Sequence, residues 1–142
     1  MKIVYTAHAT AVGGRGGGTA KTADGKLDLK MDHPPEMGGK GLHNNPEQLF
    51  AAGYSTCYLG AIKNVAGKQQ PPVKIADDAS VTAHVSFADR EDNVGFGIVA
   101  SLDVKLPGVD KAKAEELAAK AHDVCPYSNL IRVAHKVETK IV

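Results

Sequence analysis

The most constraining feature of this chain is a stretch from Leu49 to Ile62 that carries no charged residue and is apolar or small nearly all round. The residues that flank it are typical of helix ends. Asn45 can cap a helix, Pro46 fits its first turn, and Gly67 is a suitable stop. Because a helix without a polar face does not suit a protein surface, we expect this helix to be buried.

Strands are indicated on both sides of this helix by residues that alternate between apolar and polar. Asp24-Gly25 reads as a hairpin turn, and Asp110 can cap a second helix that ends near Asp123, before Pro126 breaks it. The alternating segments are 3–12, 27–31, 81–87, 96–106 and 133–141. The hairpin turn at Asp24-Gly25 implies one more strand before it, so the order is β-β-β-α-β-β-α-β. It predicts an α+β fold with antiparallel sheets in a single domain over residues 1–142.

Charge and hydropathy argue against nucleic acids and membranes as partners. The formal charge of +1 gives no basic surface for nucleic acid, and no segment is long and apolar enough to span a membrane. We see no signal peptide, so we expect a cytoplasmic protein whose cysteines are more often reduced, catalytic or metal-binding than permanently bridged. The chain has no Trp and only 43% hydrophobic residues, so its core is lean and oligomerisation is expected.

The two cysteines are the first candidates for chemistry. Cys57 lies in the middle of the uncharged helix, and Cys125 lies 68 residues later at the end of the second helix. Gly53, Cys57 and Gly60 fall on one stripe of small residues, which would let another segment approach Cys57 closely. Equally, both cysteines can be inert members of the core, because burial alone raises a thiol pKa. A working thiolate at Cys57 needs a cation beside it.

Arg15 is the candidate cation, because it sits among Gly13, Gly14 and the run 16–18, where the backbone can approach other elements closely. An exposed loop arginine is the plain alternative. The glycine-rich loop fits neither spacing of the known phosphate-binding loops, and one Arg-Gly-Gly in a neutral chain is weak evidence for RNA binding.

Glu47 falls in the first turn of the uncharged helix, where an acid complements the helix dipole. A functional reading is that Glu47 orients Arg15. Cys57 lies ~15 Å further along the helix axis and ~80° around it, so one arginine would struggle to touch both. We therefore expect two antiparallel copies of this helix to meet in a dimer. Arg15 and Glu47 of one chain would then complete the Cys57 site of the other.

A metal site is the other arrangement to weigh. His122 and Cys125 are three residues apart at a helix end, and Cys57 could supply a third ligand. The chain has neither a Cys-x-x-Cys pair nor a His-Glu-x-x-His motif, so we favour no metal.

Two segments of the chain closely resemble the signature segments of the organic hydroperoxide resistance (Ohr) proteins, a branch of the OsmC/Ohr family. They are Asn45–Cys57, which reads NPEQLFAAGYSTC, and Val124–Asn129, which reads VCPYSN. Gly14-Arg15-Gly16 is similar to the arginine loop of that family. The sequence around Cys125 favours this branch over the osmotically induced OsmC branch, whose peroxidases take broader substrates.

The resemblance implies roles that spacing does not reveal. Cys57 would be the peroxidatic nucleophile, Cys125 the resolving thiol, and Arg15 and Glu47 the residues that activate Cys57. The fold would be an intertwined homodimer, with antiparallel sheets wrapped around two central helices and active sites at the interface. No cofactor would be bound. The substrates would be alkyl and fatty-acid hydroperoxides, and the reductant a dithiol such as dihydrolipoamide or a lipoylated protein.

One segment departs from the resemblance. Residues 130–136 read LIRVAHK, where the family leads us to expect a run similar to Ala-Thr-Arg-Gly-Asn, although Arg132 is retained. We expect this change to alter the setting of Cys125 or the rate of regeneration. A different class of function is a peroxide sensor, in which the disulfide signals without turnover.

Overall fold

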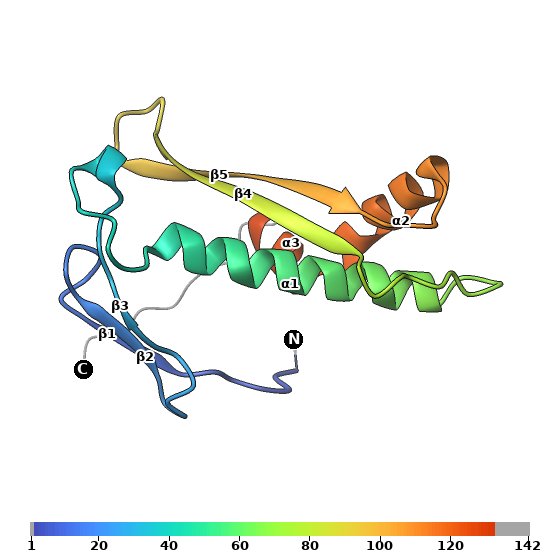
Figure 1. Cartoon of the computed structure of the whole chain (residues 1–142), viewed down its shortest axis with the longest axis horizontal. Helices are drawn as coiled ribbons and strands as arrows, with labels where there is room; N and C mark the ends of the chain where they lie inside the picture. The colour runs from blue at the N-terminus through green and yellow to red at the C-terminus, as the bar shows by residue number, and fades with distance from the viewer. Residues whose placement is uncertain (1, 133–142) are drawn as a thin grey trace. The chain divides into compact units, whose positions relative to one another are not determined.

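The structure is a computed structural model that describes residues 2–132 (Figure 1). The chain divides into two compact units, Met1–Phe50 and Ala51–Val142, and the expectation of one domain stays a prediction. The elements follow in the order β1 Ala9–Val12, β2 Thr19–Thr22, β3 Asp28–Lys30, η1 Pro35–Met37, α1 Pro46–Gly67, β4 Ser80–Asp89, β5 Phe96–Lys105, α2 Lys111–Val124 and α3 Pro126–Arg132.

The first unit contains a three-stranded antiparallel sheet in the order β1-β2-β3. The predicted hairpin turn at Asp24-Gly25 is confirmed, since Thr22 N–H donates to the Leu27 carbonyl at 2.9 Å across it. The prediction that the first strand begins at residue 3 is wrong. β1 begins at Ala9, which pairs with Thr22 at the end of β2. The turn follows Thr22, so residues 3–8 have no further residues of β2 to pair with.

α1 begins where the sequence predicts. The Asn45 side chain accepts a hydrogen bond from Gln48 N–H at 2.9 Å, and the Gln48 side chain accepts one from Asn45 N–H at 3.1 Å. This reciprocal pair is a capping box, which satisfies two of the free N–H groups at the start of a helix. The helix ends at Gly67, as expected.

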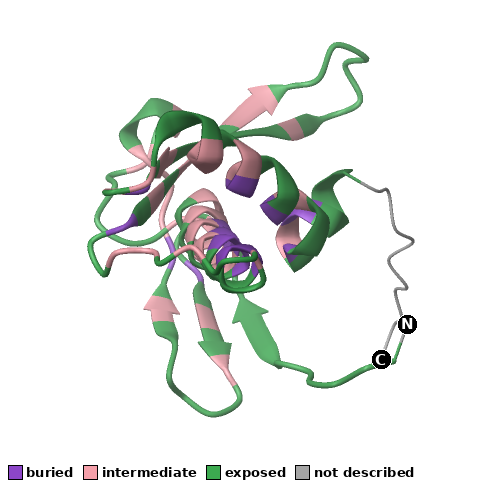
Figure 2. Cartoon of the chain, turned by 90° about the vertical axis from the view of Figure 1, so that its right-hand side faces the viewer, coloured by how far each residue is buried: buried purple, intermediate pink, exposed green. Residues whose placement is uncertain are grey.

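The burial expected for α1 is found on only one side of it in the single chain. Figure 2 looks along this helix and shows buried segments on it and on its neighbours. The opposite side leaves Ala52, Thr56 and Gly60 exposed. The buried residues of α1 are Tyr54, Tyr58, Ala61, Ile62, Val65 and Ala66.

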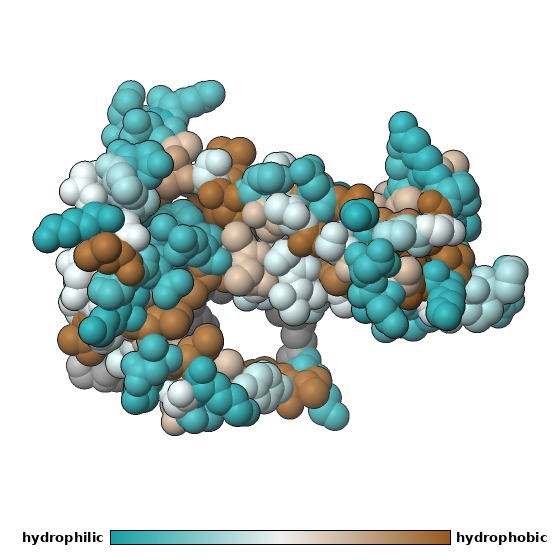
Figure 3. All heavy atoms as spheres, in the orientation of Figure 1, coloured by the Kyte–Doolittle hydropathy of each residue, from teal (hydrophilic) through white to brown (hydrophobic). Residues whose placement is uncertain are grey.

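The second unit contains the predicted long hairpin. β4 and β5 pair in antiparallel register from Ser80 opposite Lys105 to Asp89 opposite Phe96. Apolar residues near the turn of this hairpin are exposed in the single chain, and Phe96 keeps 62% of its accessible surface. Hydrophobic side chains, brown in Figure 3, accordingly reach the molecular surface among the hydrophilic ones.

α2 packs against the second half of α1. Asp110 caps α2 as predicted, accepting a hydrogen bond from Lys113 N–H at 3.0 Å. Leu117 of α2 is fully buried in a cluster with Val65 and Ala66 of α1. Val73, Ile75 and Val109 cover the edge of this cluster, so the connections on both sides of the hairpin take part in the core.

The structure has a short helix, α3, that the sequence did not predict. Pro126 does break α2, but it also begins a new helix, because a proline at the first helical position gives up no hydrogen bond. The strand predicted at 133–141 lies outside the described residues. Antiparallel sheets and helices together confirm the α+β class. Within residues 2–132 no helix is long and apolar enough to cross a membrane.

The capping box of α1 gives a first prediction. Replacing Asn45 by Ala should lower the free energy of unfolding by about 1 kcal/mol, because one N–H group at the start of α1 loses its partner. Urea denaturation at fixed protein concentration measures this change. The control is Asn64→Ala at an exposed position within the same helix, where the alanine should be neutral or stabilising. An equal effect of the two substitutions would contradict the assignment.

Candidate active site

The structure brings the two cysteines together. Cys57 lies in the middle of α1 and is half-buried, whereas Cys125 is fully buried at the end of α2. The Cys125 thiol donates a hydrogen bond to the Cys57 sulfur across 3.4 Å, and both cysteines are free. A disulfide requires sulfur atoms about 2.05 Å apart, so a small approach would join them. The structure therefore holds two free thiols in direct contact.

Cys125 occupies a joint between two helices. Its N–H donates to the Ala121 carbonyl at 2.9 Å and closes α2, while its carbonyl accepts from Asn129 N–H at 2.9 Å and opens α3. Its own backbone is extended, with φ −77° and ψ 119°. Tyr58 of α1 holds the preceding turn, since its hydroxyl donates to the Ala118 carbonyl at 2.6 Å. Burial raises the pKa of Tyr58 to about 12, which keeps this donor protonated.

Close approach to Cys57 depends on Gly53, one helical turn earlier in α1. A Cβ atom at Gly53 would lie 2.5 Å from the hydroxyl oxygen of Tyr127 and 3.0 Å from the carbon that bears it. The predicted role of the small-residue stripe is thus confirmed at Gly53. At Gly60 none of the residues 2–132 would come within 4 Å of such an atom. Tyr127 follows Pro126 in α3, so Gly53 lets the segment after Cys125 lie against α1.

The surroundings of Cys57 disfavour its thiolate. Burial is the main cause that raises the pKa of Cys57, and the neighbouring Cys125 raises it further. A hydrogen bond from the Tyr127 backbone N–H to the Cys57 sulfur acts in the opposite direction. Hydrogen bonding to the charged form of a group favours that form, but here burial outweighs it. The direction of this shift agrees with the expectation that a reactive Cys57 needs a cation beside it, which stays a prediction.

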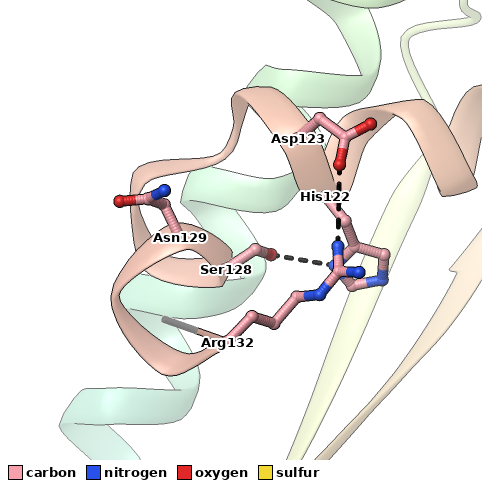
Figure 4. A pocket seen from close by; sticks show the side chains of 5 residues that line it. All are labelled: His122, Asp123, Ser128, Asn129 and Arg132. Atoms are coloured by element: carbon pink, nitrogen blue, oxygen red, sulfur yellow. Dashed lines mark hydrogen bonds and ion pairs between the residues drawn. The ribbon is translucent and has the colours of Figure 1, made fainter. Parts of the chain in front are cut away.

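Three polar side chains near the cysteines make contacts that the sequence did not predict. The fully buried Ser128 hydroxyl lies 3.0 Å from the Tyr54 hydroxyl and 3.0 Å from Nδ1 of His122. Figure 4 shows Ser128 pointing at the His122 ring. Burial lowers the pKa of His122, and the nearby Arg132 lowers it further, against a weaker opposing effect of Asp123. Each of the three lies three residues from a cysteine, but this spacing alone does not predict that they meet.

These contacts bear on the metal alternative. His122 directs Nδ1 to Ser128 and packs its ring against Tyr58, with the ring centroids 4.7 Å apart. Among the described residues no three His, Cys, Asp or Glu side chains gather as metal ligands would. A hollow of about 300 Å³ opens beside this network, lined by His122, Asp123, Ser128, Asn129 and Arg132.

Arg15 and Glu47 form a separate group in the first unit. Two nitrogens of Arg15 donate to the two carboxylate oxygens of Glu47, at 2.8 and 3.2 Å. Such a bidentate pair fixes the direction of the guanidinium as well as its position. The side chain of Arg15 keeps 31% of its accessible surface and that of Glu47 keeps 11%. The predicted pairing of these two residues is therefore present, whereas their action on Cys57 stays a prediction.

The loop that carries Arg15 is held by close backbone contacts. Gly17 N–H donates to the Met31 carbonyl at 3.1 Å, and Met31 N–H donates to the Gly18 carbonyl at 2.8 Å. A Cβ atom at Gly18 would lie 2.3 Å from the carbonyl oxygens of Val12 and Gly14, so only glycine fits there. Sequence reasoning missed His33, whose ring packs against Gly16.

The chain is similar in sequence to a known protein family and to several of its members. Residues 39–140 match the model of the OsmC-like protein family. The organic hydroperoxide resistance protein of Xanthomonas axonopodis pv. citri is 48% identical over 132 residues, which cover 92% of this chain and 89% of that protein. Organic hydroperoxide resistance protein OhrB of Bacillus subtilis is 40% identical over 139 residues, covering 96% and 98%.

A solved structure is similar throughout. The crystal structure of an organic hydroperoxide resistance protein OsmC from Legionella pneumophila superposes with a TM-score of 0.84 at 45% identity. The match covers 92% of both chains. The predicted OsmC/Ohr-like fold class is thereby confirmed.

The contact between Gly53 and Tyr127 gives a second prediction. Gly53→Ala should push Tyr127 off α1 and slow the formation of the Cys57–Cys125 disulfide about tenfold, because reactive groups lose rate steeply when displaced by about 1 Å. The measurement is the loss of free thiols after addition of diamide. Gly67→Ala is the matched control on the same helix, since a Cβ atom there meets no described residue within 4 Å. Equal rates in the two variants would show that Tyr127 does not set the approach of Cys125.

Proposed function

The chain belongs to the organic hydroperoxide resistance branch of the OsmC-like family, and from this premise we propose that it is a thiol peroxidase that reduces organic hydroperoxides to alcohols. The observation that carries the proposal is the 3.4 Å contact between the free thiols of Cys57 and Cys125. Two cysteines held in this way can pass through an oxidised and a reduced state with little movement of the chain. That is what a catalytic disulfide requires.

In the first step the Cys57 thiolate attacks the outer oxygen of the hydroperoxide. The O–O bond breaks, the alcohol leaves after its alkoxide takes up a proton, and Cys57 becomes a sulfenic acid. Cys57 is the more exposed of the two cysteines, which supports it as the thiol that meets the substrate. The substrates of this proposal are alkyl and fatty-acid hydroperoxides.

In the second step the Cys125 thiol condenses with the sulfenic acid. A disulfide forms between Cys57 and Cys125, and the hydroxyl group leaves as water. Closing the disulfide protects Cys57 from a second peroxide, which would oxidise the sulfenic acid irreversibly to the sulfinic acid. The full burial of Cys125 supports this role, because it keeps the resolving thiol away from peroxide in solution.

Regeneration requires an external dithiol that attacks the disulfide and leaves both cysteines reduced. We assign this role to a lipoyl-type dithiol, dihydrolipoamide or a lipoylated protein, in the cytoplasm. Thiol–disulfide exchange with a dithiol needs no group bound to the protein, so the cycle uses only the cysteines and the two substrates.

Arg15 and Glu47 provide the charge that Cys57 needs. Burial raises the pKa of Cys57, and a guanidinium beside the sulfur would counter this effect and also stabilise the alkoxide as it leaves. The bidentate pair supports the assignment of Glu47 as the residue that orients Arg15. In the homodimer that we propose, Arg15 and Glu47 of one subunit complete the Cys57 site of the other. The exposed apolar residues of β5 and the exposed side of α1 support such a dimer.

The main test follows the consumption of tert-butyl hydroperoxide by the purified protein with dihydrolipoamide. Wild type should turn over repeatedly, and Cys57→Ser should fall to the rate of buffer alone because the nucleophile is lost. Cys125→Ser should stop after about two equivalents, because the second peroxide oxidises the Cys57 sulfenic acid to the sulfinic acid, which mass spectrometry detects. Thr82→Ser, at an exposed position in β4, is the control. A wild type that consumes one equivalent and stops would favour a peroxide sensor or another reductant.

A mixed dimer tests the sharing of the site between subunits. Arg15→Ala and Cys57→Ser proteins, each inactive alone, are joined in one dimer and isolated through two different affinity tags. If Arg15 acts across the dimer, one of the two sites is intact and about half of the wild-type rate returns. If Arg15 acts on the cysteine of its own chain, neither site is intact and no activity returns. Sedimentation of the wild type as a monomer would contradict the dimer itself.

A further inference from the structure

One buried chain of hydrogen bonds has no part in the proposed peroxidase reaction. The Tyr54 hydroxyl, the Ser128 hydroxyl and Nδ1 of His122 follow one another at 3.0 Å and 3.0 Å. Ser128 is fully buried and Tyr54 nearly so. A buried hydroxyl that loses its partners is left without water to replace them, so these three side chains constrain one another strongly.

The position of each member relative to the cysteines is regular. Tyr54 precedes Cys57 by three residues on α1, and residues three apart lie on the same side of a helix. His122 precedes Cys125 by three residues on α2, and Ser128 follows it by three residues on α3. Ser128 therefore ties the two helices that meet at Cys125 to each other, and then ties both to the turn of α1 that precedes Cys57.

We propose that Tyr54, Ser128 and His122 form a positioning network for the resolving cysteine, which holds the Cys125 sulfur beside Cys57 and sets how often the sulfenic acid closes to the disulfide. This inference rests on the proposed peroxidase cycle and adds residues to its second step. None of the three residues touches the peroxide. They act through the placement of the joint between α2 and α3.

The chemistry of the second step explains why such positioning matters. The sulfenic acid of Cys57 has two fates. Condensation with the Cys125 thiol gives the disulfide and water, whereas reaction with a second hydroperoxide gives the sulfinic acid and one more alcohol. The first route is intramolecular, so its rate depends on the geometry of the two sulfur atoms, while the second depends only on peroxide concentration. Loosening the joint would therefore shift the balance toward the sulfinic acid.

The ring contacts around the network also support a positioning role. Tyr58 packs against His122 with ring centroids 4.7 Å apart, and Tyr54 stacks on Tyr127 with centroids 6.0 Å apart at an angle of 16°. Tyr127 also donates its backbone N–H to the Cys57 sulfur. The hydroxyl chain and the stacked rings thus fix the segments before and after Cys125 against α1.

The first test measures the approach of Cys125 without any peroxide. Ellman's reagent reacts at the accessible Cys57 and releases one thionitrobenzoate, and attack by Cys125 on the resulting mixed disulfide releases the second. Ser128→Ala removes both hydrogen bonds and should slow the second release about tenfold or more, and Tyr54→Phe should slow it by less. The first release should stay within about twofold of the wild type, because the setting of Cys57 itself is kept.

Two controls separate positioning from stability. Tyr58→Phe also removes a buried tyrosine hydroxyl that joins α1 to α2, but this hydroxyl binds the Ala118 carbonyl and not the network. It should leave the second release unchanged even if the protein is less stable. His122→Asn retains a polar atom near the place of Nδ1 and should preserve the rate, whereas His122→Gln puts its amide near the place of Nε2 and should not.

The second test uses the complete cycle with dihydrolipoamide and increasing tert-butyl hydroperoxide. Inactivation per turnover, measured as the Cys57 sulfinic acid, should rise about tenfold in Ser128→Ala at equal peroxide concentration. The proposal is overturned if the second thionitrobenzoate release in Ser128→Ala stays within twofold of the wild type, or if Tyr58→Phe slows it equally. Failure of the wild type to turn over would instead reject the peroxidase function, while the exchange experiment would still decide on the network.

Discussion

The docking of the α2–α3 joint on α1 is the contact on which the candidate site depends. Two tyrosines of α1, one turn apart, reach across it: Tyr58 to the Ala118 carbonyl in α2, and Tyr54 to the Ser128 hydroxyl in α3. The apolar cluster of Val65, Ala66 and Leu117 supports the same arrangement further along α1. Burial of apolar surface and the Tyr58 hydroxyl hold α2 on α1, whereas the Tyr54 hydroxyl reaches the segment after Cys125. Cys125 lies between these two contacts, 3.4 Å from the Cys57 sulfur.

Burial has opposite consequences for the two cysteines. In the proposed cycle it is an advantage for Cys125, since a resolving thiol should meet only the sulfur of Cys57. For Cys57 it is a cost, because burial raises its pKa and so reduces the fraction of thiolate. A single environment cannot serve both needs. The proposed division of labour meets the difficulty by supplying the activating charge from the Arg15 guanidinium, which Glu47 directs.

The parts of the fold that could be predicted from the sequence are those that depend on neighbouring residues. The caps at Asn45 and Asp110, the turn at Asp24-Gly25 and the long hairpin all follow from local patterns, and each is present. The start of the first strand could not be predicted in the same way, because strand length is set by the partner strand. The polar network was missed for a similar reason. A serine in a short helix after a proline gives no local sign that it will meet a tyrosine 74 residues earlier.

The joint at Cys125 has a mechanical consequence. The amide N–H of this one residue ends α2 and its carbonyl begins α3, so a displacement of its backbone moves the ends of both helices. In the proposed cycle the sulfur of Cys125 closes the 3.4 Å to Cys57 when the disulfide forms. Any part of that movement that passes to the backbone would be shared between the last turn of α2 and the first turn of α3. One covalent bond would thereby couple the ends of two helices.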